Sequence, residues 1–413
     1  MDEPRTQSAS ERPVAAAGPD DASLSVDAGV VVAHSPQSDP EPLAAFAERL
    51  AGDVVDELAR STDARWRFVR DEPDRLSDGT ARQPAEFLDV AAERMVDGPY
   101  DLVVVVTDVP LLARDQTRVP GLASPVSRVA VISTDRLRSG PRDRPVRALD
   151  DPAVRWNGAA LLAHLLGHVL GATHGDGEAM QPFRFDSDRR SVPSFDAYAQ
   201  HYLESVASSI PESETAERGP LARLTFHLRS ALANPRQVGR ALADSRGLLL
   251  PLSLPKLSTA AVTPTLILVF SAETWDVGLN LTNGTAAAFA IAAVLAAATH
   301  VMFVQNLFFP RRHSQVTTEH MALVNVTAYL ILLLGTVGLF LLVGAIMLVI
   351  EFYVFPPNLM TNWPSLTNPE IDLVDLLRTG GFIATIGVLS GALAGGLENR
   401  TLVRHLALFR DEP

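Results

Sequence analysis

Three histidines of this chain stand at a spacing that suits one metal ion. His164, His168 and His174 lie in the stretch HLLGHVLGATH, and residues 155–170 have the pattern of a helix. Side chains four residues apart on a helix share a face, so His164 and His168 can bind one ion. Gly171 can take a left-handed conformation after the helix, which lets His174 reach the same ion. Three neutral imidazoles with an open fourth position are a catalytic zinc set.

The spacing HxxxHxxGxxH resembles the zinc-binding consensus of the metzincin metallopeptidases, HExxHxxGxxH, with one departure. In that family a glutamate follows the first histidine and serves as the general base that activates water. Leu165 occupies this position here, and leucine cannot accept a proton. The resemblance therefore implies zinc ligands at His164, His168 and His174 without the family's catalytic group.

The resemblance extends upstream of the histidines. Residues 101–109 and 129–137 are similar to the strands that precede the active-site helix in archaemetzincins, so the resemblance covers about residues 28–182. Archaemetzincins also have a cysteine-rich second zinc site, which a chain without cysteine cannot form. Metzincins place a methionine in a turn beneath the metal. The resemblance points to Met180 for this role, at a shorter spacing from His174 than archaemetzincins have.

Three functions remain open for the histidine site. In the first, which we expect, the site binds zinc, peptide hydrolysis is weak or absent, and the protein has a regulatory or binding role. In the second, the protein is an active zinc metallopeptidase with another carboxylate as base. Asp176 and Glu178 are the nearest candidates, and either could instead be a fourth ligand. In the third, the protein is a membrane scaffold or partner-binding protein, and the histidines are a relic metal site.

Composition narrows the cofactors and partners. The net charge of the 413-residue chain is -13 and its arginines are scattered among more numerous carboxylates, so we expect no nucleic acid partner. The absence of cysteine excludes disulfides, thiolate zinc sites and iron–sulfur clusters, so a metal must be held by His, Asp or Glu. Zinc is the expected cofactor. The composition, with Lys256 as the only lysine, resembles that of proteins from high-GC bacteria.

The N-terminal half has the pattern of an α/β domain. Apolar or alternating segments predict strands, amphipathic segments predict helices, and the resemblance implies a mixed sheet with an active-site helix. We expect this metzincin-like domain over residues 28–193, after a disordered tail over residues 1–27. The predicted strands cover residues 28–34, 64–70, 101–107 and 127–134, and the predicted helices cover residues 42–60, 84–96 and 155–170.

The C-terminal half has the pattern of an α-helical transmembrane domain. It follows an amphipathic helical connector over residues 194–246 that is interrupted at Pro235. Two segments without charge are long enough to cross a bilayer, and a third uncharged segment is shorter. A fourth segment, which precedes these three in the chain, is a weak candidate because it contains Lys256 and three prolines. The expected spans are residues 247–272 (weak), 286–309, 324–350 and 381–397, within a domain over residues 247–398 and before a tail over residues 399–413.

The arginines predict the orientation of these spans. The positive-inside rule places Arg311, Arg312 and the tail 399–413 in the cytoplasm and the acidic loop 352–378 outside. The first residues lack the basic start and apolar core of a signal peptide, so we expect the α/β domain in the cytoplasm of a multi-pass protein in a bacterial plasma membrane. Four crossings satisfy both expectations. Three crossings with an exported α/β domain are the alternative.

The expected partners are the lipid bilayer and a peptide or protein at the histidine site. Gly387, Gly391 and Gly395 recur every four residues on the last predicted span. Such a row of glycines gives a helix a flat face against which a second helix can pack closely. Oligomerisation through this face is therefore possible.

Overall fold

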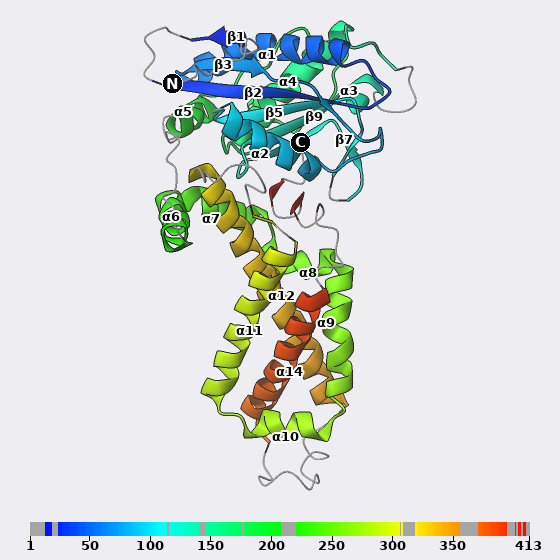
Figure 1. Cartoon of the computed structure of the whole chain (residues 1–413), viewed down its shortest axis with the longest axis vertical. Coiled ribbons are helices and arrows are strands. Elements are labelled where there is room, and N and C mark those ends of the chain that lie inside the picture. The colour runs from blue at the N-terminus through cyan, green and yellow to red at the C-terminus, as the bar shows by residue number, and fades with distance from the viewer. Residues whose placement is uncertain are drawn as a thin grey trace, which may run out of the picture. The chain divides into compact units, whose positions relative to one another are not determined.

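The computed structural model divides the chain into two compact units, which are described separately. The first comprises Met1–Ala241, Phe309–Val324 and Leu408–Pro413, and the second comprises Leu242–Phe308 and Asn325–Ala407. Figure 1 shows the sheet and its helices in the first unit and the long helices of the second. The structure describes residues 13–18, 24–98, 100–113, 115–139, 146–175, 177–207, 220–305, 307–308, 319–354, 371–394, 401, 404–405 and 408–409.

The first unit is built on a mixed β-sheet. Its central strands are parallel, and an antiparallel strand closes each edge. The strands lie in the order β1 (Pro13–Ala17), β3 (Arg65–Arg70), β2 (Ser25–His34), β5 (Leu102–Thr107), β9 (Val129–Ser133) and β8 (Gly121–Ser124), and β4 (Asp74–Arg75) also pairs with β2. The mixed sheet and its helices confirm the predicted α/β class. A separate hairpin joins β6 (Leu111–Leu112) and β7 (Arg118–Val119).

Helices cover both faces of this sheet, which explains its continuous apolar strands. All six residues of β5, LVVVVT, are buried. Leu102, Val104 and Val106 join the core formed with α1 (Pro40–Thr62) and α4 (Pro152–Val169). On the other face, β5 packs against α2 (Leu88–Asp97), as Figure 1 shows. The remaining short helices are η1 (Pro84–Phe87), α3 (Thr134–Ser139), η2 (Glu178–Met180) and α5 (Ala197–Ala207).

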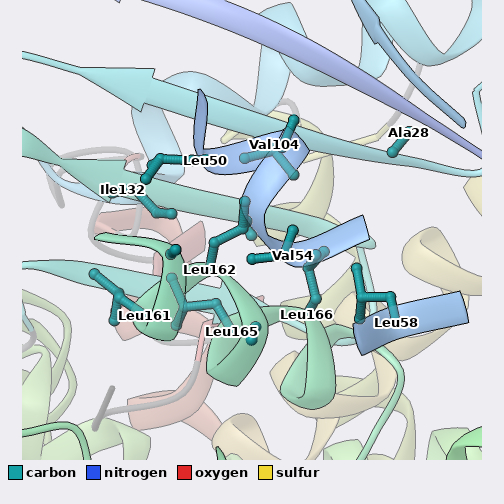
Figure 2. Packing of buried hydrophobic residues seen from close by; sticks show 14 of the residues in the cluster. Ala28, Leu50, Val54, Leu58, Val104, Ile132, Leu161, Leu162, Leu165 and Leu166 are labelled. Carbon is teal, nitrogen blue, oxygen red and sulfur yellow. The ribbon is translucent and has the colours of Figure 1, made fainter. Parts of the chain in front are cut away.

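The helix that carries the first two histidines is α4, whose position is set by contacts at its start and by packing along its length. The Asp151 side chain caps its start by accepting a hydrogen bond from the Ala153 N–H at 2.8 Å. The Arg155 guanidinium then donates to both carboxylate oxygens of Asp53 on α1, at 2.7 and 2.5 Å. Further along α4, leucines pack between α1 and the sheet, as Figure 2 shows with Leu161, Leu162, Leu165 and Leu166 against Leu50, Val54 and Ile132.

Two strands of more than two residues, β1 and β8, lie where the sequence predicts none. The sequence predicts a disordered tail over residues 1–27, but β1 pairs with β3 and β2 begins at Ser25, so the prediction is wrong for these segments. Strand β8 was also missed. Both segments, PVAAA and GLAS, consist mostly of small residues. Their pairing depends on the neighbouring strand rather than on an apolar pattern of their own.

The connector and the second unit are helical. The predicted interruption is confirmed, because one helix ends at Ala233 and the next begins at Pro235. Three helices are long and apolar enough to cross a membrane, and a fourth candidate is a pair of helices bent by 94°. The helices are α6 (Pro220–Ala233), α7 (Pro235–Asp244), η3 (Gly247–Leu249), α8 (Leu250–Ser253), the bent pair α9 (Pro255–Leu268) and α10 (Ala272–Asn280), and α11 (Asn283–Val304), α12 (Glu319–Tyr353) and α14 (Leu373–Ala394).

Two of the predicted helix-packing glycines on α14 lie against α9 of the same chain. A Cβ at Gly387 would lie 2.7 Å from Cγ2 of Thr265, and one at Gly391 would lie 3.0 Å from Cβ of Ala261. The close approach that glycine permits is therefore used within one chain. Gly395 lies outside the described residues, as do Arg311 and Arg312, and oligomerisation through this row stays a prediction.

Candidate metal centre

The three histidines come from one helix and the turn that follows it. His164 and His168 lie on α4 and are 2% and 1% exposed, whereas His174 is exposed. Gly171 has a φ of +91°, the left-handed conformation that the sequence predicts for it. The Gly171 N–H donates to the His168 carbonyl at 2.9 Å, so the helix ends there and the chain turns back.

The ring nitrogens of the triad converge on one point. The Nε2 atom of His168 lies 3.0 Å from Nε2 of His164 and 3.2 Å from Nε2 of His174. One ligand atom from each ring lies within 4.8 Å of the other two. In a tetrahedral zinc site with bonds of roughly 2.0–2.1 Å, two nitrogen ligands are about 3.4 Å apart. The triad therefore needs only small adjustments to hold zinc.

Backbone carbonyls determine which nitrogen of each buried ring faces this point. The Nδ1 atom of His164 lies 2.8 Å from the Ala179 carbonyl, and Nδ1 of His168 lies 2.8 Å from the Ala172 carbonyl. A carbonyl oxygen only accepts hydrogen bonds, so each Nδ1 carries a proton, and in the neutral imidazole each Nε2 then presents a lone pair. Two lone pairs at 3.0 Å repel each other, and a cation bound between them removes the repulsion. This donor set fits a metal ion.

Met180 packs against α4, the helix that carries His164 and His168. It is 2% exposed, and a Cβ at Gly167 would lie 2.5 Å from its Sδ and 3.0 Å from Cε1 of Phe195. Gly167 therefore lets the methionine approach the backbone of α4 next to His168. The family resemblance indicates the methionine from the sequence. It does not indicate Gly167, because the histidine spacing gives no information on the contact between Gly167 and Met180.

Leu165 is directed into the core. It is fully buried, and its Cδ1 atom lies near Gly121 on β8, where an added Cβ would come within 2.8 Å of it. Figure 2 shows Leu165 among the other core leucines of α4. The position that holds the general base in the metzincin consensus is thus part of the apolar packing of this domain.

Glu178 lies beside the triad but is not one of its ligands. Among the described residues, the group around the converging nitrogens contains three histidines and no carboxylate. Glu178 is exposed and lines a pocket of about 350 Å³ that His164 also lines. Asp176, the other candidate from the sequence, lies outside the described residues.

Comparisons with known proteins give a limited result. No protein-family model matches this chain. No curated protein matches it either. Among solved structures, the chain is similar to archaemetzincin from Methanopyrus kandleri (21% identity, TM-score 0.28, 43% of this chain and 95% of that one). It is also similar to a zinc-dependent peptidase from Methanocorpusculum labreanum (19% identity, TM-score 0.27, 42% of this chain and 99% of that one). At these TM-scores the likeness decides neither fold nor function.

Proposed function

We propose that this protein is a membrane-anchored, metzincin-like zinc-binding protein in which peptide hydrolysis is weak or absent and the site has a regulatory or binding role. One observation supports the metal above all. The Nε2 atoms of His164 and His168 lie 3.0 Å apart, while the Nδ1 atom of each ring lies against a backbone carbonyl. His174 supplies the third nitrogen at 3.2 Å from His168.

The residues around the triad explain the expected weakness of hydrolysis. A zinc ion held by three imidazoles acts as a Lewis acid and lowers the pKa of water. Hydrolysis also needs a group that accepts and returns a proton, and loss of such a group typically lowers a rate by about a hundred- to ten-thousandfold. Leu165 cannot act in this way.

The membrane anchor and its orientation belong to the same proposal. Three apolar helices support membrane association. The low lysine content and the pattern of arginines favour a bacterial plasma membrane with the α/β unit in the cytoplasm. On this proposal, the metal centre faces the cytoplasm and would bind cytoplasmic peptides or proteins.

Zinc content tests the proposal directly. The full-length protein, purified in detergent without added metal, should contain about one zinc per chain by elemental analysis. Removal by a chelator should lower its thermal unfolding midpoint, and added zinc should restore it, because a ligand that binds only the folded state stabilises it. A chelator-treated protein that takes up no zinc would refute the metal centre and favour a membrane scaffold with a relic site.

A second candidate function is an active zinc metallopeptidase with Glu178 as general base. The observation that favours it is the position of Glu178, which lines the same pocket as His164. Its carboxylate has no hydrogen-bond or ion-pair partner in the described part of the chain and is exposed to water. A carboxylate in this setting is able to take a proton from a water molecule in the pocket.

Replacement of Glu178 distinguishes the two candidates. If Glu178 is the base, Glu178→Gln should lower the rate of peptide hydrolysis by about a hundred- to ten-thousandfold and leave the zinc content unchanged. Glu72→Gln is the matched control, because Glu72 is also exposed and does not line the pocket. An unchanged rate in Glu178→Gln would exclude Glu178 as the base, and no measurable hydrolysis in either protein would favour the binding role.

A further inference from the structure

The pocket beside His164 contains two arginines that the metal site does not use. It has a volume of about 350 Å³ and lies between α4 and the segment that follows the histidine turn. Arg184 and Arg189 line it together with Glu178, and its apolar walls come from Ala160, Pro182, Phe183 and Pro193. A volume of this size is at the lower end of that of small-ligand sites, which are roughly 300–1,000 Å³.

Neither arginine is paired with an acidic side chain among the residues that the structure describes. Other arginines of this unit have acidic partners, since Arg155 donates to Asp53, Arg82 to Glu86 and Arg94 to Asp71. In contrast, Arg184 and Arg189 form no ion pair within the described residues. The Nε atom of Arg189 is buried and has no hydrogen-bond acceptor there. A buried donor without an acceptor is unfavourable, so an occupant of the pocket that supplies an acceptor would be stabilised.

The charges in this pocket favour an anionic occupant. The described residues that line it carry two guanidinium groups and one carboxylate, that of Glu178, and a metal ion at His164 would add positive charge. The planar guanidinium of arginine matches a carboxylate, which it binds through two parallel hydrogen bonds. The apolar walls suit the side chain that accompanies a carboxylate at the end of a peptide. A free carboxylate on a short peptide therefore matches the pocket in charge and size.

We propose that this pocket binds the C-terminal carboxylate of a peptide, with Arg184 and Arg189 as the recognising residues. The inference rests on the proposed function, because it names the ligand class of the same site. It holds whether the bound peptide is hydrolysed or only retained. It also places the peptide terminus beside His164, so that the adjacent peptide bond lies next to the metal centre.

Binding of two matched peptides tests this inference in the full-length protein in detergent. Fluorescein-labelled Ala-Ala-Phe with a free carboxylate should bind at least about tenfold more tightly than the same peptide with a C-terminal amide, as measured by fluorescence anisotropy. Arg189→Gln should weaken binding of the acid by about ten- to a hundredfold and leave binding of the amide unchanged. Arg184→Gln should act in the same direction.

Control variants separate recognition from a general effect of charge. Arg49 is exposed on α1 and does not line the pocket, so Arg49→Gln should bind the acid like the unmodified protein. Arg189→Lys keeps the charge but loses the planar fork, and it should bind the acid with intermediate affinity. A peptide amide ending in Ala-Ala-Glu places the carboxylate on a side chain. If it bound as tightly as the acid, the assignment to the C-terminus would be overturned.

The same experiment keeps the two proposals distinct when it is done with zinc-loaded and metal-free protein. If zinc is bound but the acid and the amide bind equally, the carboxylate pocket is refuted and the metal centre stands. If the chain takes up no zinc but still prefers the acid, the metal centre is refuted and the pocket stands. Binding of neither peptide under either condition also refutes the pocket.

Discussion

His168→Ala is expected to reduce the zinc content from about one ion per chain to a trace. His168 is the central residue of the triad, because its Nε2 atom lies within 3.2 Å of Nε2 of both other histidines. Loss of a residue that only orients a ligand weakens metal binding by about ten- to a hundredfold, and loss of the ligand itself should weaken it further. Elemental analysis and competition with a chelator would measure both the content and the affinity.

A matched histidine variant shows whether the loss is specific. His201 is exposed on α5 and is not part of the triad, so His201→Ala should keep the full zinc content. His168→Ala also leaves the Ala172 carbonyl without its His168 partner, and circular dichroism would check that α4 remains folded. Full zinc content in a folded His168→Ala protein would show that the ion is held elsewhere in the chain.

The features predicted correctly from the sequence are those determined by local periodicity. The spacing of His164 and His168 defines one face of a helix, and Gly171 provides the left-handed residue that turns the chain toward His174. The strand β5 was predicted because its valines form a continuous apolar run, and its burial on both faces follows from the helices that cover it. Each of these signals lies within a few residues of the feature that it predicts.

The features that were missed depend on contacts between distant segments. Nothing in the histidine spacing indicates that the Ala179 carbonyl orients His164 or that Gly167 accommodates Met180. The arginines of the stretch FRFDSDRR resemble an ordinary charged loop, and only the fold places Arg184 and Arg189 beside His164. The sequence therefore predicts the candidate metal ligands, whereas the ring orientations and the neighbouring pocket require the structure.

Leu165→Glu is expected to raise the rate of peptide hydrolysis by at least about a hundredfold, because it supplies a general base at the position that the metzincin consensus reserves for one. Leu165 is fully buried against Gly121 and the core leucines, so a carboxylate there also loses hydration. The metal-free variant should therefore unfold at a lower temperature than the unmodified protein.

Leu165→Gln separates the chemical effect from the structural one. Glutamine has nearly the same shape as glutamate and also places a polar group in the core, but it cannot act as a base at neutral pH. Both variants should lose stability without metal, and only Leu165→Glu should gain activity. If Leu165→Glu keeps its zinc but is no faster than Leu165→Gln, a missing base does not limit hydrolysis. The triad and the arginine pocket would then form a site that holds a peptide by its terminus without cleaving it, which is the binding role proposed for this protein.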